Sequence, residues 1–286
     1  MKIIHVDNRG LKLRVIHNPS SNPKATPILM TTPGWGWSAE GYVGTLGYLA
    51  EDYDFYFLDT RGSGGSDAPP SIEDYQFYHF AEDFECVRKA FGLEKLNFVG
   101  HSYGGVLGMH YALQFPESIE KLIILCSYMG KDDQYVKAYE KAMDQKKQEA
   151  WYVDVKSYQE LKNVDESQEK LENWLDGLLP LYFSDQSALK QNRELLAQAT
   201  IRLEPFKGSL HCCPNWDAGL YEAVKAIKTE THIICGEEDF VCPESENRRI
   251  HESIKDSKLT TIPGVGHFPW IEKPKEFKKA FDSIFR

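Results

Sequence analysis

The pentapeptide Gly-His-Ser-Tyr-Gly at residues 100–104 constrains the fold of this chain more than any other stretch, because of what surrounds it. An apolar run at 96–99 comes directly before it, and a helix-like segment at 106–115 follows. A sharp turn from a strand into a helix raises the central serine above a sheet and leaves room only for glycine on either side. The first turn of such a helix offers backbone N–H groups that favour developing negative charge. The pattern therefore predicts that Ser102 is a nucleophile.

A serine hydroxyl is a poor nucleophile at neutral pH, so it needs a general base, and the base needs a carboxylate to orient it. On a scaffold of this kind the acid follows the serine in the chain, and a histidine follows the acid. A short apolar strand at 231–235 runs into a turn that carries Glu237, Glu238 and Asp239. We expect Asp239 to be the acid, because it lies where the turn leaves the strand. The two glutamates are the alternatives.

One of the nine histidines is placed to act as the general base. The last apolar strand, 259–262, leads into a glycine- and proline-rich loop that holds His267. His267 comes third in the chain after Ser102 and Asp239, so we expect it to reach both side chains. The other histidines are expected at the surface or in packing, and we interpret His101 as support for the turn around the nucleophile.

Acyl transfer also needs hydrogen-bond donors for the negatively charged oxygen that develops in the transition state. One donor is expected to be the backbone N–H of Tyr103, the residue after the nucleophile. The other is expected from the loop after the third strand, which the sequence places at 32–37 after an apolar run at 27–31. The backbone N–H of Trp35 is the candidate. The alternative is a plain glycine–proline turn with two packing tryptophans.

Together these segments resemble the α/β-hydrolase superfamily over nearly the whole chain. The stretch 58–66 also resembles the D-x-R-G-x-G-x-S segment that is best developed in proline iminopeptidases and their relatives, and we interpret it as structural. One departure is Pro33, which stands where the family usually has the histidine of a His-Gly pair. The resemblance implies a mostly parallel eight-stranded sheet that is flanked by helices and carries an inserted helical cap.

The order of strands and helices divides the chain into two units. Strands and helices alternate up to Ser127, which itself indicates a mostly parallel sheet covered on both faces. From 128 to 215 no strand-like run appears, and the alternation returns near Trp216. We expect 1–127 and 216–286 to form the core domain and 128–215 a helical cap over the active site. A disordered insert is the alternative, but aromatics at amphipathic spacing argue against it. Candidate cap helices are 134–148, 157–162, 167–178 and 186–199.

The cap is expected to set the choice of substrate. Trp151, Trp174 and Trp216 are candidates for lining an apolar pocket, although each is also an ordinary packing residue. An aminopeptidase would need a cap carboxylate to hold the ammonium group of its substrate. Glu204 is the candidate for that role.

Composition limits the partners of this chain of 286 residues. Its formal net charge of −10 at pH 7 makes nucleic acids and anionic membranes poor partners and leaves a small-molecule substrate. The start shows no basic region before an apolar one, and no run of about 18 apolar residues appears, so we expect a cytoplasmic protein. The six cysteines do not suggest a disulfide framework. The adjacent Cys212 and Cys213 lack further ligands at metal-binding spacing, so we expect neither a metal nor another cofactor.

These observations favour a serine hydrolase that cleaves a small-molecule ester, lactone or amide through an acyl-enzyme. Ser102 would attack the carbonyl, His267 would take and return the proton, and Asp239 would hold the imidazole. A proline-iminopeptidase-like aminopeptidase, favoured by 58–66, competes with a carboxylesterase or lactonase, favoured by Pro33. Carbon–carbon bond hydrolases and cofactor-free lyases share the triad, whereas dehalogenases and epoxide hydrolases of the superfamily use Asp as the nucleophile. A ligand receptor on the same fold is the non-catalytic alternative.

Overall fold

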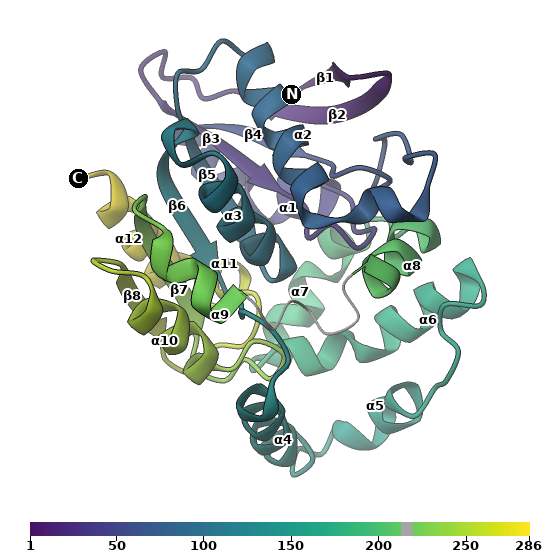
Figure 1. Ribbon diagram of the computed structural model, residues 1–286. Coiled ribbons are helices and arrows are strands. Elements are labelled where there is room, and N and C mark those ends of the chain that lie inside the picture. Colours follow the sequence, from purple (N-terminus) through teal and green to yellow (C-terminus); the bar gives the residue numbers. More distant parts are fainter. Residues whose placement is uncertain (213–219) are drawn as a thin grey trace.

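An eight-stranded sheet forms the centre of the protein, and the computed structural model describes residues 1–212 and 220–286. The strands lie across the sheet in the order β1-β2-β4-β3-β5-β6-β7-β8 (Figure 1). All residues of the central β5 are buried, as expected for a strand that is covered on both faces. The strand bounds are β1 (Lys2–Asn8), β2 (Leu11–Asn18), β3 (Thr26–Thr31), β4 (Tyr53–Leu58), β5 (Leu96–His101), β6 (Ile119–Leu125), β7 (Glu230–Gly236) and β8 (Lys258–Ile262).

Most neighbouring strands run parallel. β1 and β2 form an antiparallel hairpin that turns at Arg9 and Gly10, both of which have positive φ angles, and β2 also pairs antiparallel with β4. All pairs from β4 through β3, β5, β6 and β7 to β8 are parallel. Parallel neighbours need crossover connections, which helices supply here. The predicted mostly parallel sheet of eight strands is therefore confirmed.

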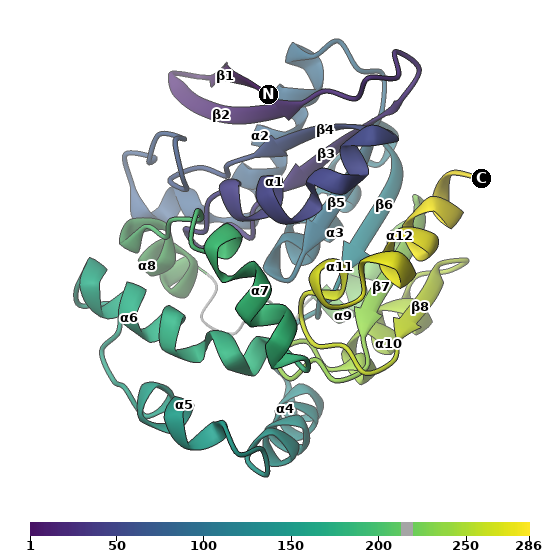
Figure 2. The same ribbon diagram turned by 180° about the vertical axis from the view of Figure 1, so that it is seen from behind.

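Helices cover both faces of the sheet (Figures 1 and 2). Alternate strand residues point to opposite faces. Leu29 and Phe98 accordingly pack in the same hydrophobic cluster as residues of α2, α3 and α10, whereas Ile28 and Val99 pack with residues of α1, α11 and α12. The helix bounds are α1 (Glu40–Leu46), α2 (Phe77–Ala90), α3 (Tyr103–Gln114), α9 (Leu220–Ala223), α10 (Glu244–Ser253), α11 (Pro269–Glu272) and α12 (Pro274–Asp282).

A run of helices interrupts the alternation between β6 and β7, and the described residues in this interval form no strand. These helices lie together at one end of the sheet (Figure 1). Asp132 and Ser167 begin two of them, because their side chains accept hydrogen bonds from backbone N–H groups three residues on. None of the helices in 1–212 and 220–286 is long and apolar enough to cross a membrane. The bounds are α4 (Asp133–Lys146), α5 (Tyr152–Gln159), α6 (Gln168–Leu178), α7 (Gln186–Leu196) and α8 (Leu203–Cys212), with a 3₁₀ turn η4 (Leu179–Tyr182).

The carboxyl ends of the parallel strands bring the predicted site residues to one edge of the sheet. β5 ends directly before Ser102, β7 ends three residues before Asp239, and β8 ends five residues before His267. Because these strands are parallel, their carboxyl ends lie at the same edge. Ligands of open α/β sheets bind outside this edge. The predicted boundary of the helical segment at 215–216 lies outside the described residues.

Candidate active site

Ser102 occupies the sharp turn between β5 and α3. Its φ of 56° and ψ of −125° are rare for a residue with a side chain. A Cβ atom on Gly100 would overlap the backbone of Gly104, and one on Gly105 would overlap the side chain of Ser127, so only glycine fits at these positions. The Ser102 carbonyl accepts hydrogen bonds from Gly105 N, at 2.9 Å, and from Ser127 Oγ, at 2.7 Å. The turn is thus fixed from both sides.

Asp239 and His267 form a buried pair. His267 Nδ1 lies 2.7 Å from Asp239 Oδ2, and the two residues are 3% and 2% exposed. The other carboxylate oxygen, Oδ1, accepts the backbone N–H groups of Val241 and Cys242, each at 3.0 Å. A carboxylate only accepts hydrogen bonds, so Nδ1 carries the proton and Nε2 is left as the basic nitrogen. The backbone N–H of His267 donates to the carbonyl of Tyr182 at 2.8 Å, which fixes the loop.

The two alternative acids point elsewhere. Glu237 Oε2 accepts the backbone N–H of Gly264 at 3.2 Å. Glu238 lines a separate polar hollow that also contains Lys146. Of the three acidic residues in this turn, the structure therefore brings only Asp239 to His267.

The structure differs from the expected geometry at Ser102. Ser102 and His267 line the same cavity, but among the described residues no hydrogen bond joins Ser102 Oγ to His267. The Ser102 side chain instead interacts with the thiol of Cys242: burial raises the pKa of this thiol well above its usual value, and a hydrogen bond with Ser102 opposes that rise. Serine side chains exchange among three staggered rotamers. The expectation that His267 contacts both Ser102 and Asp239 is therefore met here only for Asp239.

The two residues that carry the candidate oxyanion donors line the same cavity as Ser102. Tyr103 is the first residue of α3, so its backbone N–H is at the amino end of that helix. Trp35 lies in the loop after β3, and Trp35, Tyr103 and Ser102 all line one cavity. The next residue, Gly36, has a φ of 110°, and its carbonyl accepts the backbone N–H of Arg202 at 3.2 Å. This hydrogen bond ties the loop to the helical segment.

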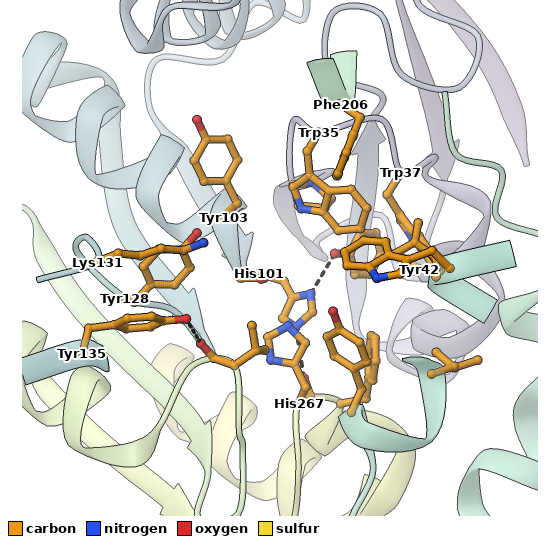
Figure 3. A pocket seen from close by; sticks show the side chains of 18 residues that line it. Trp35, Trp37, Tyr42, His101, Tyr103, Tyr128, Lys131, Tyr135, Phe206 and His267 are labelled. Carbon is orange, nitrogen blue, oxygen red and sulfur yellow. Dashed lines mark hydrogen bonds between the residues drawn. The ribbon is translucent and has the colours of Figure 1, made fainter. Parts of the chain in front are cut away.

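A cavity of about 180 Å³ lies over Ser102 between the sheet edge and the helical segment. Figure 3 shows the side chains around it, most of which are aromatic. Trp174, Tyr182 and Phe206 come from α6, η4 and α8, so the helical segment supplies one wall. The lining residues are Pro33, Trp35, Trp37, Tyr42, His101, Ser102, Tyr103, Tyr128, Lys131, Tyr135, Trp174, Leu175, Leu179, Tyr182, Phe206, Val241, His267 and Phe268.

Of the four candidate substrate-binding residues, Trp174 lines this cavity. Trp151 does not: it packs against a separate hydrophobic cluster of the helical segment and borders the polar hollow of Glu238. Glu204 is also absent from the lining. It lies in the first turn of α8, close enough for its charge to add to the burial that raises the pKa of Tyr75. Trp216 lies outside the described residues.

Sequence reasoning missed several residues of the lining, among them Tyr42 and Lys131. Lys131 comes a few residues after the carboxyl end of β6, at the same edge of the sheet as the predicted site residues. A search of every loop that follows a parallel strand would have included it. Tyr42 lies on α1, and its Oη is 2.8 Å from Nδ1 of His101.

One group of described residues has the spacing of a metal site. Ligand atoms of Cys126, Asp239 and His267 lie within 4.8 Å of one another. However, burial raises the pKa of the Cys126 thiol well above its usual value, and a metal would bind the thiolate. Asp239 and His267 already form a hydrogen bond with each other. Of the adjacent cysteines Cys212 and Cys213, the first donates a hydrogen bond from Sγ to the carbonyl of Ile72, and the second lies outside the described residues.

The sheet order, the crossover helices and the serine turn at the end of β5 define an α/β-hydrolase fold. A family model described as "alpha/beta hydrolase fold" matches residues 27–274, and the chain belongs to this family.

Individual known proteins are more distantly similar. The chain is 24% identical over 258 residues to RutD of Escherichia coli O26:H11, whose provisional name is carbamate hydrolase, and the match covers 88% of both chains. An alpha/beta fold family hydrolase from Bacillus anthracis superposes with a TM-score of 0.78 at 18% identity, over 99% of this chain and 98% of that one. The enol-lactonase from Burkholderia xenovorans LB400 superposes with a TM-score of 0.73 at 18% identity, over 99% and 100%. The solved structures support the fold.

Proposed function

We propose that this protein is a serine hydrolase that cleaves an ester or lactone of a small molecule through an acyl-enzyme on Ser102. The observation that carries the proposal is the buried Asp239–His267 pair, 2.7 Å apart, beside a serine in a strained strand-to-helix turn. The carboxylate of Asp239 is held in place and favours the imidazole tautomer of His267 in which Nε2 is the base. The cavity shared by Ser102 and His267 provides the place for the scissile bond.

In the proposed mechanism the Ser102 hydroxyl turns from Cys242 toward His267 and attacks the carbonyl carbon. His267 Nε2 takes the hydroxyl proton and then delivers it to the leaving oxygen, while Asp239 stabilises the imidazolium. The backbone N–H groups of Tyr103 and Trp35 bind the negatively charged oxygen of the tetrahedral intermediate. A water molecule, deprotonated by the same imidazole, then hydrolyses the acyl-enzyme.

The lining of the cavity favours esters and lactones over aminoacyl substrates. Among the described lining residues there is no aspartate or glutamate to hold a substrate ammonium group, and Glu204 lies elsewhere. The aromatic walls suit an apolar acyl or alkyl group. The names of the similar proteins, a carbamate hydrolase and an enol-lactonase, also denote cleavage of carbonyl compounds.

The helical segment 128–215 is, in this proposal, a cap that selects the substrate. Its support is that Trp174, Leu179 and Phe206 face the same cavity as Ser102. The hydrogen bonds from His267 N to Tyr182 O and from Arg202 N to Gly36 O join this segment to the two loops that carry the base and an oxyanion donor. Movement of the segment would therefore displace the loops that carry His267 and Trp35.

A substrate panel tests the proposal. Wild type and Ser102→Ala are compared on p-nitrophenyl esters, lactones and aminoacyl anilides, with circular dichroism to verify the fold. We expect wild type to cleave an ester or lactone and the variant to lose about a thousandfold or more in kcat. Equal activity of the two proteins would refute the assignment of Ser102 as the nucleophile. Tight ligand binding without turnover by wild type would indicate the receptor alternative.

A further inference from the structure

Glu272, the last residue of α11, joins two segments that are far apart in the sequence. Its Oε1 accepts the backbone N–H of Gly266 at 2.8 Å. Its Oε2 accepts the backbone N–H groups of Ser184 and Asp185, at 2.7 Å and 2.8 Å. Gly266 directly precedes His267, whereas Ser184 and Asp185 lie in the helical segment just before α7. One carboxylate therefore connects the loop of the proposed general base to the helical segment.

The backbones of the two segments touch at this point. The backbone N–H of His267 donates to the carbonyl of Tyr182 at 2.8 Å. A Cβ atom on Gly266 would overlap the same carbonyl oxygen, so the close approach requires glycine there. The Tyr182 ring lies 5.4 Å from the His267 ring and lines the cavity over Ser102. A shift of this contact would therefore move the imidazole.

The three backbone donors that converge on Glu272 suit a carboxylate better than any other side chain. Both carboxylate oxygens only accept, whereas the amide of glutamine would offer one acceptor and turn a donor toward a backbone N–H group. Burial raises the pKa of Glu272, and the three hydrogen bonds and the charge of Lys146 oppose this rise. Lys146 is a buried lysine of α4 whose Nζ donates to the carbonyl of Phe183 at 3.2 Å. The surroundings thus favour the ionised form as a bridge.

We propose that Glu272 is a positioning residue, which holds the backbone of His267 against the helical segment so that Nε2 can reach Ser102. This inference rests on the function proposed above and adds a residue that is not among the described residues lining the cavity. A displacement of a catalytic group by about 1 Å can cost about a hundredfold in rate. The role therefore predicts an effect on kcat rather than on KM.

Kinetics of three variants test the proposal. Glu272→Gln and Glu272→Asp are compared with wild type on the ester that wild type cleaves best. Glu85→Gln is the matched control, because Glu85 is also a buried carboxylate, accepts hydrogen bonds from Arg88 and Tyr111, and does not line the cavity. Urea unfolding gives the stability of every variant, and amide hydrogen exchange by NMR reports on the backbone N–H of His267.

We expect Glu272→Gln to lower kcat about tenfold to a hundredfold and to leave KM within about threefold of wild type. Glu272→Asp keeps the charge but is one methylene too short to reach both segments, so it should lose less. Glu85→Gln should keep kcat even where it is equally destabilised. The proposal is overturned if Glu272→Gln keeps kcat, or if Glu85→Gln loses as much. Should Glu272→Gln not fold, Glu272→Asp is judged by the same criteria.

Hydrogen exchange separates this inference from the proposed function. The His267 amide should exchange about tenfold or more faster in Glu272→Gln than in wild type, and in Glu85→Gln only as far as global stability falls. Unchanged exchange in Glu272→Gln overturns the positioning role, whatever the activity. If wild type hydrolyses no ester but the exchange depends on Glu272, the positioning role stands and the hydrolase mechanism fails. If wild type hydrolyses esters and Glu272→Gln changes neither kcat nor exchange, the hydrolase stands and the positioning role fails.

Discussion

His101 Nε2 lies 3.0 Å from the backbone carbonyl oxygen of His267, so the residue before the proposed nucleophile holds the backbone of the proposed general base. A carbonyl oxygen only accepts, so Nε2 of His101 carries the proton and Nδ1 accepts from the Tyr42 hydroxyl at 2.8 Å. Burial lowers the pKa of His101 well below its ordinary value and keeps it neutral in this tautomer. Two loops that are far apart in the sequence are thereby fixed to each other.

The first prediction concerns this chain of hydrogen bonds. Tyr42→Phe removes the donor to His101 Nδ1 and leaves a buried acceptor without its partner, so we expect a loss of about 1–3 kcal/mol in the free energy of unfolding. It should also lower kcat on the best ester. Tyr53→Phe is the control, because the Tyr53 hydroxyl bonds Asp282, away from the site. Urea unfolding and steady-state kinetics measure both effects. Equal kcat values in the two variants would show that this chain does not position His267.

The second prediction distinguishes Asp239, the proposed acid, from its neighbour Glu238. Asp239→Asn keeps the shape of the side chain but no longer favours the tautomer with a proton on Nδ1, so kcat should fall about 10³- to 10⁴-fold. Glu238→Gln removes the same charge one residue away, on a side chain that lines a different hollow, and should stay within about threefold of wild type. A large loss in Glu238→Gln with little in Asp239→Asn would reverse the assignment.

The third prediction compares two tryptophans of the helical segment. Trp174 lines the cavity and Trp151 does not, so Trp174→Ala should change the ratio of kcat/KM between short and long acyl esters by about tenfold. Trp151→Ala should leave that ratio unchanged and lower the melting temperature, because the side chain only packs. Kinetics on an ester series and thermal unfolding measure the two effects. A change of specificity in Trp151→Ala instead would contradict the placement of the cavity.

The fourth prediction concerns acid stability. Hydrogen bonds from Arg88 lower the pKa of Glu85 to about 2 from its ordinary value of 4.5, and Glu85 also accepts from the Tyr111 hydroxyl at 3.1 Å. The resulting stability is present above pH 4.5 and disappears as the pH falls through about 2. Glu85→Gln should lower the free energy of unfolding by about 1–2 kcal/mol at pH 7. The deficit relative to wild type should shrink between pH 4.5 and pH 2. A deficit that is constant over this range would exclude the ion pair as its cause.

Local signals in the sequence were sufficient for the sheet and for the order of the site residues. Gly100 and Gly105 have no room for a side chain, and an apolar run marks the buried parallel strand β5. Asp239 and His267 were identifiable because each follows a parallel strand, and parallel strands end at one edge. These features depend on short segments and on topology.

The helical segment was predicted less completely. The expected helices at 134–148, 167–178 and 186–199 correspond to α4, α6 and α7, but α5 begins at Tyr152 rather than at 157, and α8 was not expected.

The reason for missing α8 is local. It contains Pro205 and Gly208, which normally argue against a helix. Pro205 is tolerated in the first turn, where its missing N–H would have no partner. Gly208 is required because a Cβ atom would overlap the ring of Tyr75.

Which side chains reach the cavity depends on long-range packing, which local sequence patterns do not reveal. From the sequence, Trp151 and Trp174 are equally good candidates for lining a pocket. The orientation of α6 brings Trp174, but not Trp151, to the cavity over Ser102. The interaction of Ser102 with Cys242 depends on where the loop after β7 returns to the serine turn. Lys131 was overlooked because a single lysine in a loop carries no pattern.

The central claim is that Ser102 is a nucleophile activated by His267, and covalent labelling tests it most directly. The protein is treated with diisopropyl fluorophosphate, and the adduct is located by intact-mass measurement and peptide mapping. We predict one phosphoryl group per chain, on Ser102, and a strongly reduced rate of labelling in His267→Ala, in which the base is absent. A wild-type protein that stays unmodified, or that carries the group on another residue, would contradict the account.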